Sequence, residues 1–238
     1  MKLIIDIGNS ETKLALFSKK KMEKFIRHIT LSFEDIESFI KEKIIQKVII
    51  SSVKKNNPLI KRLKKEYDVM ILDQHTDIPI NNMYKTPESL GKDRLAAVVG
   101  ASCLYKKKNI LIVDLGTCLT FDIINSEKEY IGGRISPGLK MRYLALPHYT
   151  DNLPSCDIKR TENKIGDDTF SSIHTGIQQG MIDELNSFIE AFIKENQHNI
   201  VVITGGDYIF FEKALKNTIF AHPFLVLEGL NEILDYND

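Results

Sequence analysis

The sequence predicts an α/β protein with two similar lobes, each a mixed sheet flanked by helices, and a ligand-binding cleft between the lobes. Two observations support this fold class. A strand, a tight turn and a second strand open the chain, and the same order returns at residues 110–124. Each opening is followed by stretches with the apolar spacing of helices and by short β-branched runs, as in sheets covered by helices. Clefts between lobes commonly bind small ligands, so a site is expected there.

The first lobe is expected to span residues 1–83. Its opening run at residues 3–7 is β-branched, and Gly8-Asn9 favours a hairpin turn into a second strand. Ser32 followed by Asp35 is typical of a capped helix start. The expected elements are strands at residues 3–7, 12–17, 25–29, 48–51 and 69–72, helices at 33–43 and 58–66, and a connecting loop at 73–83.

The second lobe is expected to span residues 84–238. Pro87 favours the first turn of a long helix within residues 84–106, which would contribute to the cleft and to an interface. The glycines of residues 132–138 indicate either a backbone that approaches a ligand or a plain corner before a helix. Strands are expected at residues 110–115, 120–124 and 201–203.

A long helix is expected at residues 169–192. Apolar residues such as Ile173 and Ile177 recur on one face, and Gly176 and Gly180 would let another helix backbone come close. The pattern fits a contact between two subunits, and it fits equally a helix that covers the sheet of its own lobe.

The composition favours a globular protein with a small-molecule ligand. Lys and Arg together number 32, and so do Asp and Glu, so no overall field would hold nucleic acid or an anionic membrane. The three cysteines are widely spaced, which predicts neither a disulfide framework nor a zinc site. Asp6 interrupts the N-terminal apolar run too early for a signal peptide. A soluble protein of the reducing cytoplasm is expected, without a nucleic-acid or membrane partner.

Two strand ends have the same pattern, Asp6-Ile7-Gly8-Asn9 and Asp114-Leu115-Gly116-Thr117. The glycine lets the backbone come close to phosphate oxygens, neighbouring N–H groups and hydroxyls donate to them, and the aspartate can hold a cation. Lys13 on the following strand could reach a terminal phosphate. A single turn of this kind is common in hairpins of many proteins, whereas two copies at the ends of buried strands indicate a phosphate site.

The segment from Tyr84 to Arg94 contains the strongest candidate for acid–base chemistry. Gly91 lies inside the expected helix, where glycine costs roughly 1 kcal/mol relative to alanine. Asp93 could accept a proton from a substrate hydroxyl, and Arg94 could bind a carboxylate or phosphate through two donors. Taken alone, the pair is more often a surface ion pair at a helix start.

Taken in chain order, these motifs resemble those of type III pantothenate kinase, a family of the acetate/sugar kinase, Hsp70 and actin superfamily. The resemblance covers nearly the whole chain. The matching segments are Asp6-Ile7-Gly8-Asn9-Ser10-x-x-Lys13, Tyr84-x-x-Pro87-x-x-Leu90-Gly91-x-Asp93-Arg94, Asp114-Leu115-Gly116-Thr117-x-x-Thr120, Gly132-Gly133-x-Ile135-x-Pro137-Gly138, Thr169, Thr204-Gly205-Gly206-Asp207 and Leu225-Val226-Leu227-Glu228-Gly229-Leu230.

The resemblance implies a duplicated ribonuclease H-like, or actin-like ATPase, fold and a homodimer. It implies phosphorylation of pantothenate by ATP to 4′-phosphopantothenate, the first step of coenzyme A synthesis, with Mg²⁺ and with K⁺ or NH₄⁺. It also implies a role for each matched residue. Asp93 would be the catalytic base, Asp114 would bind the monovalent cation, and Asp6 could hold Mg²⁺. ATP would be bound by Asp6, Ile7, Gly8, Asn9, Ser10, Glu11, Thr12, Lys13 and Thr117, and pantothenate by Tyr84, Gly91, Lys92, Asp93, Arg94 and Thr169, the last reaching in from the second subunit.

Two departures from the family pattern leave the chemistry intact. Ser10 replaces a usual threonine and keeps the hydroxyl, and Cys118 replaces a usual alanine. Two alternatives remain. Another small-molecule kinase of the superfamily would not need the Tyr84 to Arg94 pattern, and a non-catalytic nucleotide-binding relative would not need a base aimed at a hydroxyl.

Overall fold

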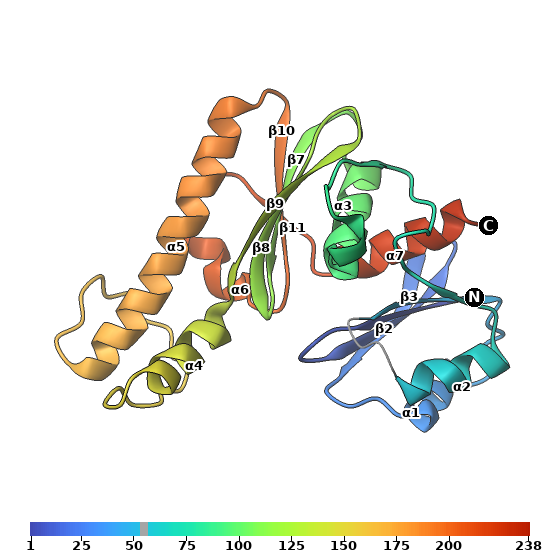
Figure 1. The fold of residues 1–238 in the computed structure, drawn as a ribbon, viewed down its shortest axis with the longest axis horizontal. Coiled ribbons are helices and arrows are strands. Elements are labelled where there is room, and N and C mark those ends of the chain that lie inside the picture. Colours follow the sequence, from blue (N-terminus) through green and yellow to red (C-terminus); the bar gives the residue numbers. More distant parts are fainter. Residues whose placement is uncertain (53–56) are drawn as a thin grey trace. The chain divides into compact units, whose positions relative to one another are not determined.

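The computed structural model describes residues 1–52 and 57–238, and these form two compact units (Figure 1). Unit 1 contains residues 1–106, 127–131 and 224–238, and unit 2 contains residues 107–126 and 132–223. The predicted α/β class with two mixed sheets flanked by helices is confirmed. The expected lobes at residues 1–83 and 84–238 stay a prediction. In the compact units, the helix after residue 91 and the C-terminal helix lie with the first sheet.

Unit 1 is built on a five-stranded sheet in the order β3-β2-β1-β4-β5. The first three strands are antiparallel, and β4 and β5 run parallel to β1. This register places Asp6 directly opposite Lys13 on one side and Ser51 on the other. The strands are β1 (Lys2–Ile7), β2 (Thr12–Ser18), β3 (Lys21–His28), β4 (Lys47–Ser52) and β5 (Val69–Ile71).

Helices cover both faces of this sheet because every second side chain of the central strands is buried on each face. Leu3, Ile5 and Val48 pack against α1 (Phe33–Ile40) and α2 (Pro58–Glu66). The capping box predicted at Ser32 is present, with its hydroxyl accepting a hydrogen bond from the Asp35 amide. The opposite face includes the fully buried Ile4 and Ile49 and is covered by α7.

Two helices cross closely over that second face, α3 (Lys92–Leu104) and α7 (Leu225–Tyr236). Glycines make the crossing possible: a Cβ on Gly229 would lie 1.8 Å from the carbonyl oxygen of Ala96. No side chain fits between backbones at that distance. The position of α3 is therefore tied to that of α7.

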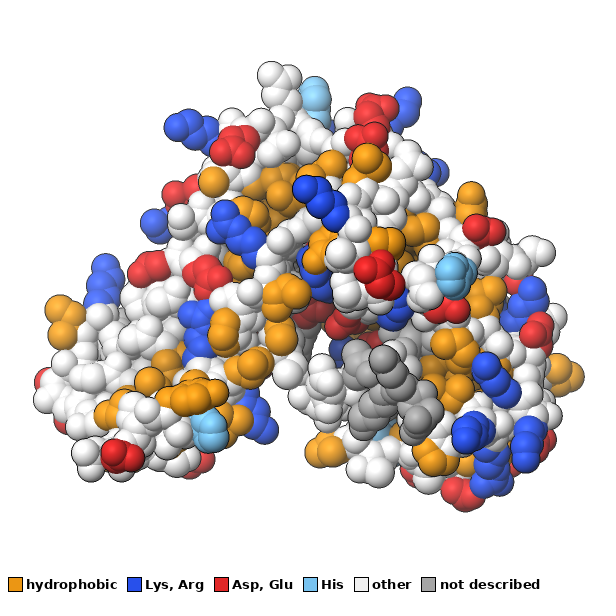
Figure 2. Space-filling model, viewed as in Figure 1, with side chains coloured by type: hydrophobic (Ala, Val, Ile, Leu, Met, Phe, Trp, Pro, Cys, Tyr) orange, Lys and Arg blue, Asp and Glu red, His pale blue; other side chains and the backbone are white. Residues whose placement is uncertain are grey.

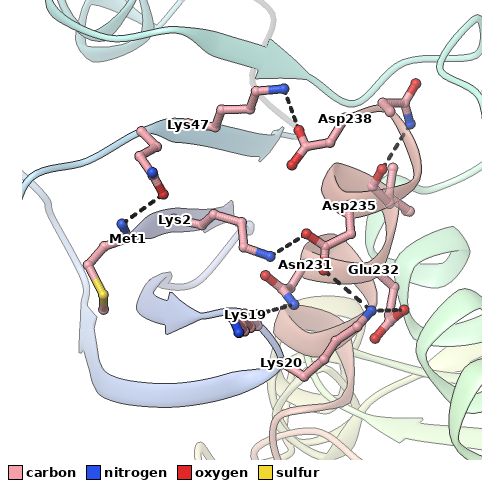
Figure 3. A network of polar contacts seen from close by, with 12 residues as sticks. Met1, Lys2, Lys19, Lys20, Lys47, Asn231, Glu232, Asp235 and Asp238 are labelled. Atoms are coloured by element: carbon pink, nitrogen blue, oxygen red, sulfur yellow. Dashed lines mark hydrogen bonds and ion pairs between the residues drawn. The ribbon is translucent and has the colours of Figure 1, made fainter.

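Ion pairs hold α7 onto the strands (Figure 3). The Lys2 ammonium contacts Asp235, Lys47 contacts Asp238, and Lys20 lies 2.5 Å from a Glu232 carboxylate oxygen. Exposed pairs contribute little to stability, but Lys2 is only 9% exposed, so removal of Asp235 would leave a buried charge without its partner and should be destabilising.

Unit 2 repeats the pattern of the first sheet. Its strands lie in the order β11-β10-β7-β8-β9, with β7 and β8 forming the second antiparallel hairpin. β10 runs parallel beside β7, as β4 does beside β1, and places Thr204 opposite Asp114. The predicted duplication is visible in this shared register. The strands are β7 (Asn109–Leu115), β8 (Cys118–Ile124), β9 (Glu129–Pro137), β10 (Asn199–Thr204) and β11 (Phe220–Ala221).

The long helix α5 (Thr169–Glu195) lies along this sheet (Figure 1). Its apolar stripe, including Ile173 and Ile177, packs against sheet residues such as Leu111. The apolar stripe of α5 therefore covers the sheet of its own lobe, which is one of the two interpretations of this pattern. Gly176 and Gly180 are exposed, and a Cβ on either would meet nothing within 4 Å.

The remaining elements are short or connect the sheets. β6 (Asn81–Asn82) interrupts the expected loop at residues 73–83 and pairs with the first residues of β9. They also include the helices α4 (Leu139–Tyr149) and α6 (Tyr208–Phe211) and the 3₁₀ turns η1 (Pro87–Ser89) and η2 (Glu212–Ala214).

Two expectations are corrected. Gly91 is not inside a helix: η1 ends at Ser89, α3 begins at Lys92, and Gly91 is the N-cap between them. Gly132 and Gly133 do not form a bend but lie within β9. A Cβ on Gly133 would lie 1.6 Å from the carbonyl oxygen of Phe121, so glycine here lets β9 pass close to β8.

Candidate active site

Asp6 lies at the end of the central strand of unit 1 and is buried, with 6% of its surface exposed. Lys13 and Ser51 occupy the same rung of the sheet on its two sides, so all three side chains point to the same face. Ser51 donates a hydrogen bond to the Asp6 carboxylate. Asp6 and Lys13, both predicted from the first phosphate motif, are thus brought together.

Burial raises the pKa of Asp6 to about 6. The ammonium of Lys13 and the hydrogen bond from Ser51 lower the pKa, whereas the negative charges of Asp93 and Glu11 raise it. A buried carboxylate with two neighbouring carboxylates favours a bound cation, because the cation offsets both the desolvation and the repulsion. The Asp6 carboxylate is therefore suited to bind Mg²⁺.

This pKa predicts how the stability of the ligand-free protein depends on pH. Asp6 binds its proton more tightly in the folded chain than at its ordinary pKa of 3.8, so its contribution to stability is lost as pH rises from about 4 to about 6. Asp6→Asn has no such loss. Relative to wild type, its free energy of unfolding should rise by roughly 3 kcal/mol between pH 4 and pH 7 in urea titrations. Asp151→Asn, at an exposed carboxylate, is the control, and equal pH profiles for wild type and Asp6→Asn would contradict the prediction.

The turn after Asp6 is closed by a hydrogen bond from the Gly8 amide to the carbonyl oxygen of Glu11, at 3.1 Å. Asn9 and Ser10 are exposed at its tip. The Ile7 side chain is buried in the core beneath α1 and α2, so only its backbone could face a phosphate. Thr12 is also buried, with 7% of its surface exposed.

Asp93 occupies the first turn of α3, and its Oδ1 accepts a 2.8 Å hydrogen bond from the Arg94 amide. A Cβ on Gly91 would lie 2.6 Å from this oxygen, so glycine leaves room for the carboxylate to fold back over the helix start. The negative charge of Asp93 contributes to the raised pKa of Asp6, so the predicted base lies near the first phosphate motif.

Tyr84 and Arg94 lie together beside this helix start. The Arg94 guanidinium carbon is 5.5 Å from the centroid of the Tyr84 ring, within the range of a cation–π contact. Arg94 is buried and Tyr84 is half-buried. Lys92 instead lines a separate pocket of about 320 Å³ with residues that include Asp73, His75 and Asn82.

The second phosphate motif belongs to unit 2. Asp114 is half-buried, with Thr120 and Thr204 on the same rung of the sheet. The hydroxyl oxygen of Thr120 is buried and has no hydrogen-bond partner among the described residues. Gly205 has φ +95°, and a Cβ there would lie 2.5 Å from an Asp114 carboxylate oxygen. The Asp114 carboxylate and the Thr120 hydroxyl are therefore neighbouring oxygen atoms at the end of this hairpin.

Two further backbone segments pack on this turn. The Asp207 amide donates a 2.8 Å hydrogen bond to the carbonyl oxygen of Leu115, and burial raises the pKa of the Asp207 carboxyl. A Cβ on Gly138 would lie 2.4 Å from the carbonyl oxygens of both Gly116 and Thr117. Thr117 itself is exposed, where a nucleotide could reach it.

Thr169 begins α5 in unit 2, next to the N-cap Asp168. It lines a surface pocket of about 900 Å³ together with Pro137, Arg142, Leu146 and other residues of α4, α5 and the segment between them. The Arg142 guanidinium is fixed at this pocket by Glu184 and by the Pro137 carbonyl.

Comparison with known proteins identifies the family. The chain matches the family described as Type III pantothenate kinase over residues 2–191. It is 40% identical over 240 residues to a type III pantothenate kinase of Phocaeicola vulgatus, covering 100% of this chain and 99% of the relative. A type III pantothenate kinase of Christiangramia forsetii is 41% identical with the same coverage. The chain belongs to the type III pantothenate kinase family.

Solved structures of distant proteins agree with this fold. A protein of Sinorhizobium meliloti assigned as a 2-dehydro-3-deoxygalactonokinase aligns with a TM-score of 0.64 at 11% identity, over 100% of this chain and 99% of its own. A Campylobacter jejuni protein assigned to the Baf family of transcriptional activators aligns with a TM-score of 0.62 at 22% identity, over 99% and 98%. At these identities the likeness concerns the fold alone.

Four residues that lie beside the predicted site residues are absent from the sequence-based set. Ser51 and Thr204 lie at the carboxyl ends of two strands that the sequence predicts. Because parallel strands end at the same edge of a sheet, their positions at strand ends could have indicated that they lie beside Asp6 and Asp114. Thr120 belongs to a matching motif, but the resemblance assigns it no role. No local sequence pattern indicates that Tyr130 stacks on Tyr84, because this contact joins segments far apart in the sequence.

No helix in residues 1–52 and 57–238 is long and apolar enough to cross a bilayer. The same residues contain no group of three or more His, Cys, Asp or Glu side chains placed to hold a metal. Mg²⁺ in phosphoryl-transfer sites is commonly held by one or two carboxylates and by substrate phosphates, so a single aspartate is compatible with it.

Proposed function

We propose that this kinase transfers the γ-phosphoryl group of ATP to the primary hydroxyl of pantothenate, giving 4′-phosphopantothenate for coenzyme A synthesis. The observation that supports it most is the position of Asp93, within electrostatic range of Asp6 and next to Arg94 at the start of α3. A carboxylate that accepts a hydroxyl proton must lie near the group that presents the phosphate.

The predicted residues would divide the tasks of this reaction among them. Asp93 would take the proton from the pantothenate hydroxyl, and Tyr84, Gly91, Lys92 and Arg94 would orient pantothenate. ATP would be held by residues 6–13 and Thr117, with the Lys13 ammonium beside the terminal phosphate. Asp6 would hold Mg²⁺, which when bound neutralises phosphate charge.

The monovalent cation would bind at Asp114. The half-buried carboxylate and the buried Thr120 hydroxyl are adjacent on one rung of the sheet, and this hydroxyl has no hydrogen-bond partner in the described part of the chain. A K⁺ or NH₄⁺ ion would give this hydroxyl a partner, and a buried hydroxyl without one is unfavourable.

The test is a coupled assay with ATP, Mg²⁺ and pantothenate in buffers of K⁺, NH₄⁺ or Na⁺ alone. Wild type should form phosphopantothenate and should be activated by K⁺ or NH₄⁺, whereas Asp114→Asn should lose this activation because it loses the anionic ligand. Absence of phosphopantothenate in every buffer would refute the kinase, and an unchanged K⁺ response of Asp114→Asn would move the cation elsewhere. Asp151→Asn is the matched control at an exposed position.

A homodimer is supported by an exposed apolar surface near Thr169. Phe170, Leu144 and Ile165 are all more than half exposed around the start of α5, α4 and the segment between them. Exposed apolar side chains in one region commonly mark an interface. Thr169 of one subunit would then reach the pantothenate site of the other. Cytoplasmic location is part of the same proposal, since ATP and pantothenate would both be available there.

A polyanion partner has little support. Basic and acidic side chains are interspersed on the face of the molecule in Figure 2, in line with equal numbers of each in the sequence. The remaining alternatives are another small-molecule kinase of the superfamily and a non-catalytic nucleotide-binding relative. The first would phosphorylate a different alcohol when that alcohol replaces pantothenate in the assay, and the second would transfer no phosphoryl group to any acceptor.

A further inference from the structure

The hairpin tip between β8 and β9, residues 127–131, belongs to unit 1, although β8 and the rest of β9 belong to unit 2. It pairs there with β6, the two-residue strand just before Tyr84. The Asn81 amide donates to the carbonyl oxygen of Lys128 at 2.8 Å, and the Met83 amide donates to that of Tyr130 at 3.1 Å. The backbone that leads into Tyr84 is therefore held by this tip.

Tyr130 also holds the Tyr84 side chain. The two rings are nearly parallel, at 5°, with centroids 5.9 Å apart, which is an offset stack. Tyr130 is completely buried, whereas Tyr84 is half-buried, so the inner ring supports the outer one. The Tyr84 amide is fixed as well, by a 3.1 Å hydrogen bond to the Asn82 side-chain oxygen.

The support extends to Arg94 through the Tyr84 ring. The guanidinium carbon lies 5.5 Å from the centroid of that ring, so a change in the tilt of Tyr84 moves one of the surfaces that Arg94 contacts. Ordering a long side chain such as arginine costs about 2 kcal/mol of rotamer entropy, and binding is tighter when the free protein has already met that cost.

We propose that Tyr130 is a positioning residue for pantothenate, which fixes Tyr84 and, through it, Arg94 in the orientation that binds the substrate. Tyr130 does not touch the substrate itself. The inference rests on the proposed roles of Tyr84 and Arg94 in binding pantothenate. It requires the aromatic ring of Tyr130, because the contact with Tyr84 is a stack.

Steady-state kinetics of Tyr130→Leu and Tyr130→Phe test this role. Tyr130→Leu removes the ring, and the KM for pantothenate should rise by about 10-fold while the KM for ATP stays within about 2-fold of wild type. Tyr130→Phe keeps the ring and should have a near-normal KM for pantothenate. Phe39→Leu removes another buried ring of the same unit, on the inner face of α1, and should change neither KM.

The result that overturns the inference is a Tyr130→Leu enzyme with a normal KM for pantothenate, or with equal increases in both KM values, which indicates only a damaged fold. If Tyr130→Leu does not yield folded protein, Tyr130→Met fills the space with a flexible side chain and gives the same comparison. Tyr84→Leu separates the two proposals. A normal KM for pantothenate in Tyr84→Leu contradicts the role of Tyr84, whereas an increase in Tyr84→Leu without one in Tyr130→Leu contradicts only the role of Tyr130.

Discussion

Replacing Asp93 with asparagine should lower kcat by on the order of 100-fold or more while both substrates still bind. Asparagine has nearly the same shape, and its side-chain oxygen can still accept the hydrogen bond from the Arg94 amide. Its amide cannot accept a proton from a hydroxyl at neutral pH, so the rate of the chemical step should fall while substrate binding is kept. Turnover is measured in the coupled assay, and binding of ATP and of pantothenate by calorimetry.

The matched control is Glu88→Gln, which makes the same carboxylate-to-amide change in the exposed turn η1, a few residues earlier in the chain. Its turnover should equal that of wild type. Near-normal turnover of Asp93→Asn would remove Asp93 from the role of base. Loss of binding together with turnover would instead assign it to substrate binding.

The same variant tests whether Thr169 of the partner subunit completes the site. Thr169→Asp would place a negative charge against the carboxylate of pantothenate, and the variant alone should be nearly inactive. In a mixed dimer with Asp93→Asn, one of the two sites has both native residues. Mixing the two inactive variants should therefore restore part of the wild-type activity, and no gain on mixing would place Thr169 outside a shared site.

The two hairpins that are proposed to bind phosphate could be located from the sequence because their signals are local. An apolar β-branched run, a glycine and a second run fix a hairpin within about 15 residues, and the polar side chains that follow fall at its end. The structure adds the register. Asp6 lies between Lys13 and Ser51, and Asp114 lies between Thr120 and Thr204, so each aspartate has a hydroxyl beside it from a strand that pairs with its own.

The parts of the fold and of the candidate site that the sequence does not predict depend on contacts between segments far apart in the chain. Nothing in the local pattern of residues 225–236 shows that α7 returns to the first sheet, where Lys2 pairs with Asp235 in its last turn and Lys47 pairs with Asp238 just after its end. The pairing of β6 with residues 129–130 is equally non-local, which is why Tyr130 escaped prediction. Gly91 was misplaced in a helix interior because a glycine N-cap and an interior glycine look alike in sequence, and only the close approach of the Asp93 carboxylate tells them apart.

The crossing of α3 and α7 predicts a large loss of stability for Gly229→Ala. The new methyl group would lie 1.8 Å from the Ala96 carbonyl oxygen and 3.0 Å from the Gly100 nitrogen, both of them backbone atoms inside a helix. Since neither can rotate away, the helices must separate, and the free energy of unfolding should fall by on the order of 4 kcal/mol. For a chain of this length that corresponds to a melting temperature lowered by roughly 10 °C, measured by circular dichroism.

Gly180→Ala is the matched control, because it makes the same substitution inside a helix where a Cβ meets nothing within 4 Å. Alanine favours a helix over glycine by up to about 1 kcal/mol, so this variant should be as stable as wild type or more stable. Equal melting temperatures for the two variants would contradict the close crossing. Since α3 contains Asp93, the proposed base, the Gly229→Ala protein that remains folded should also have a lower kcat.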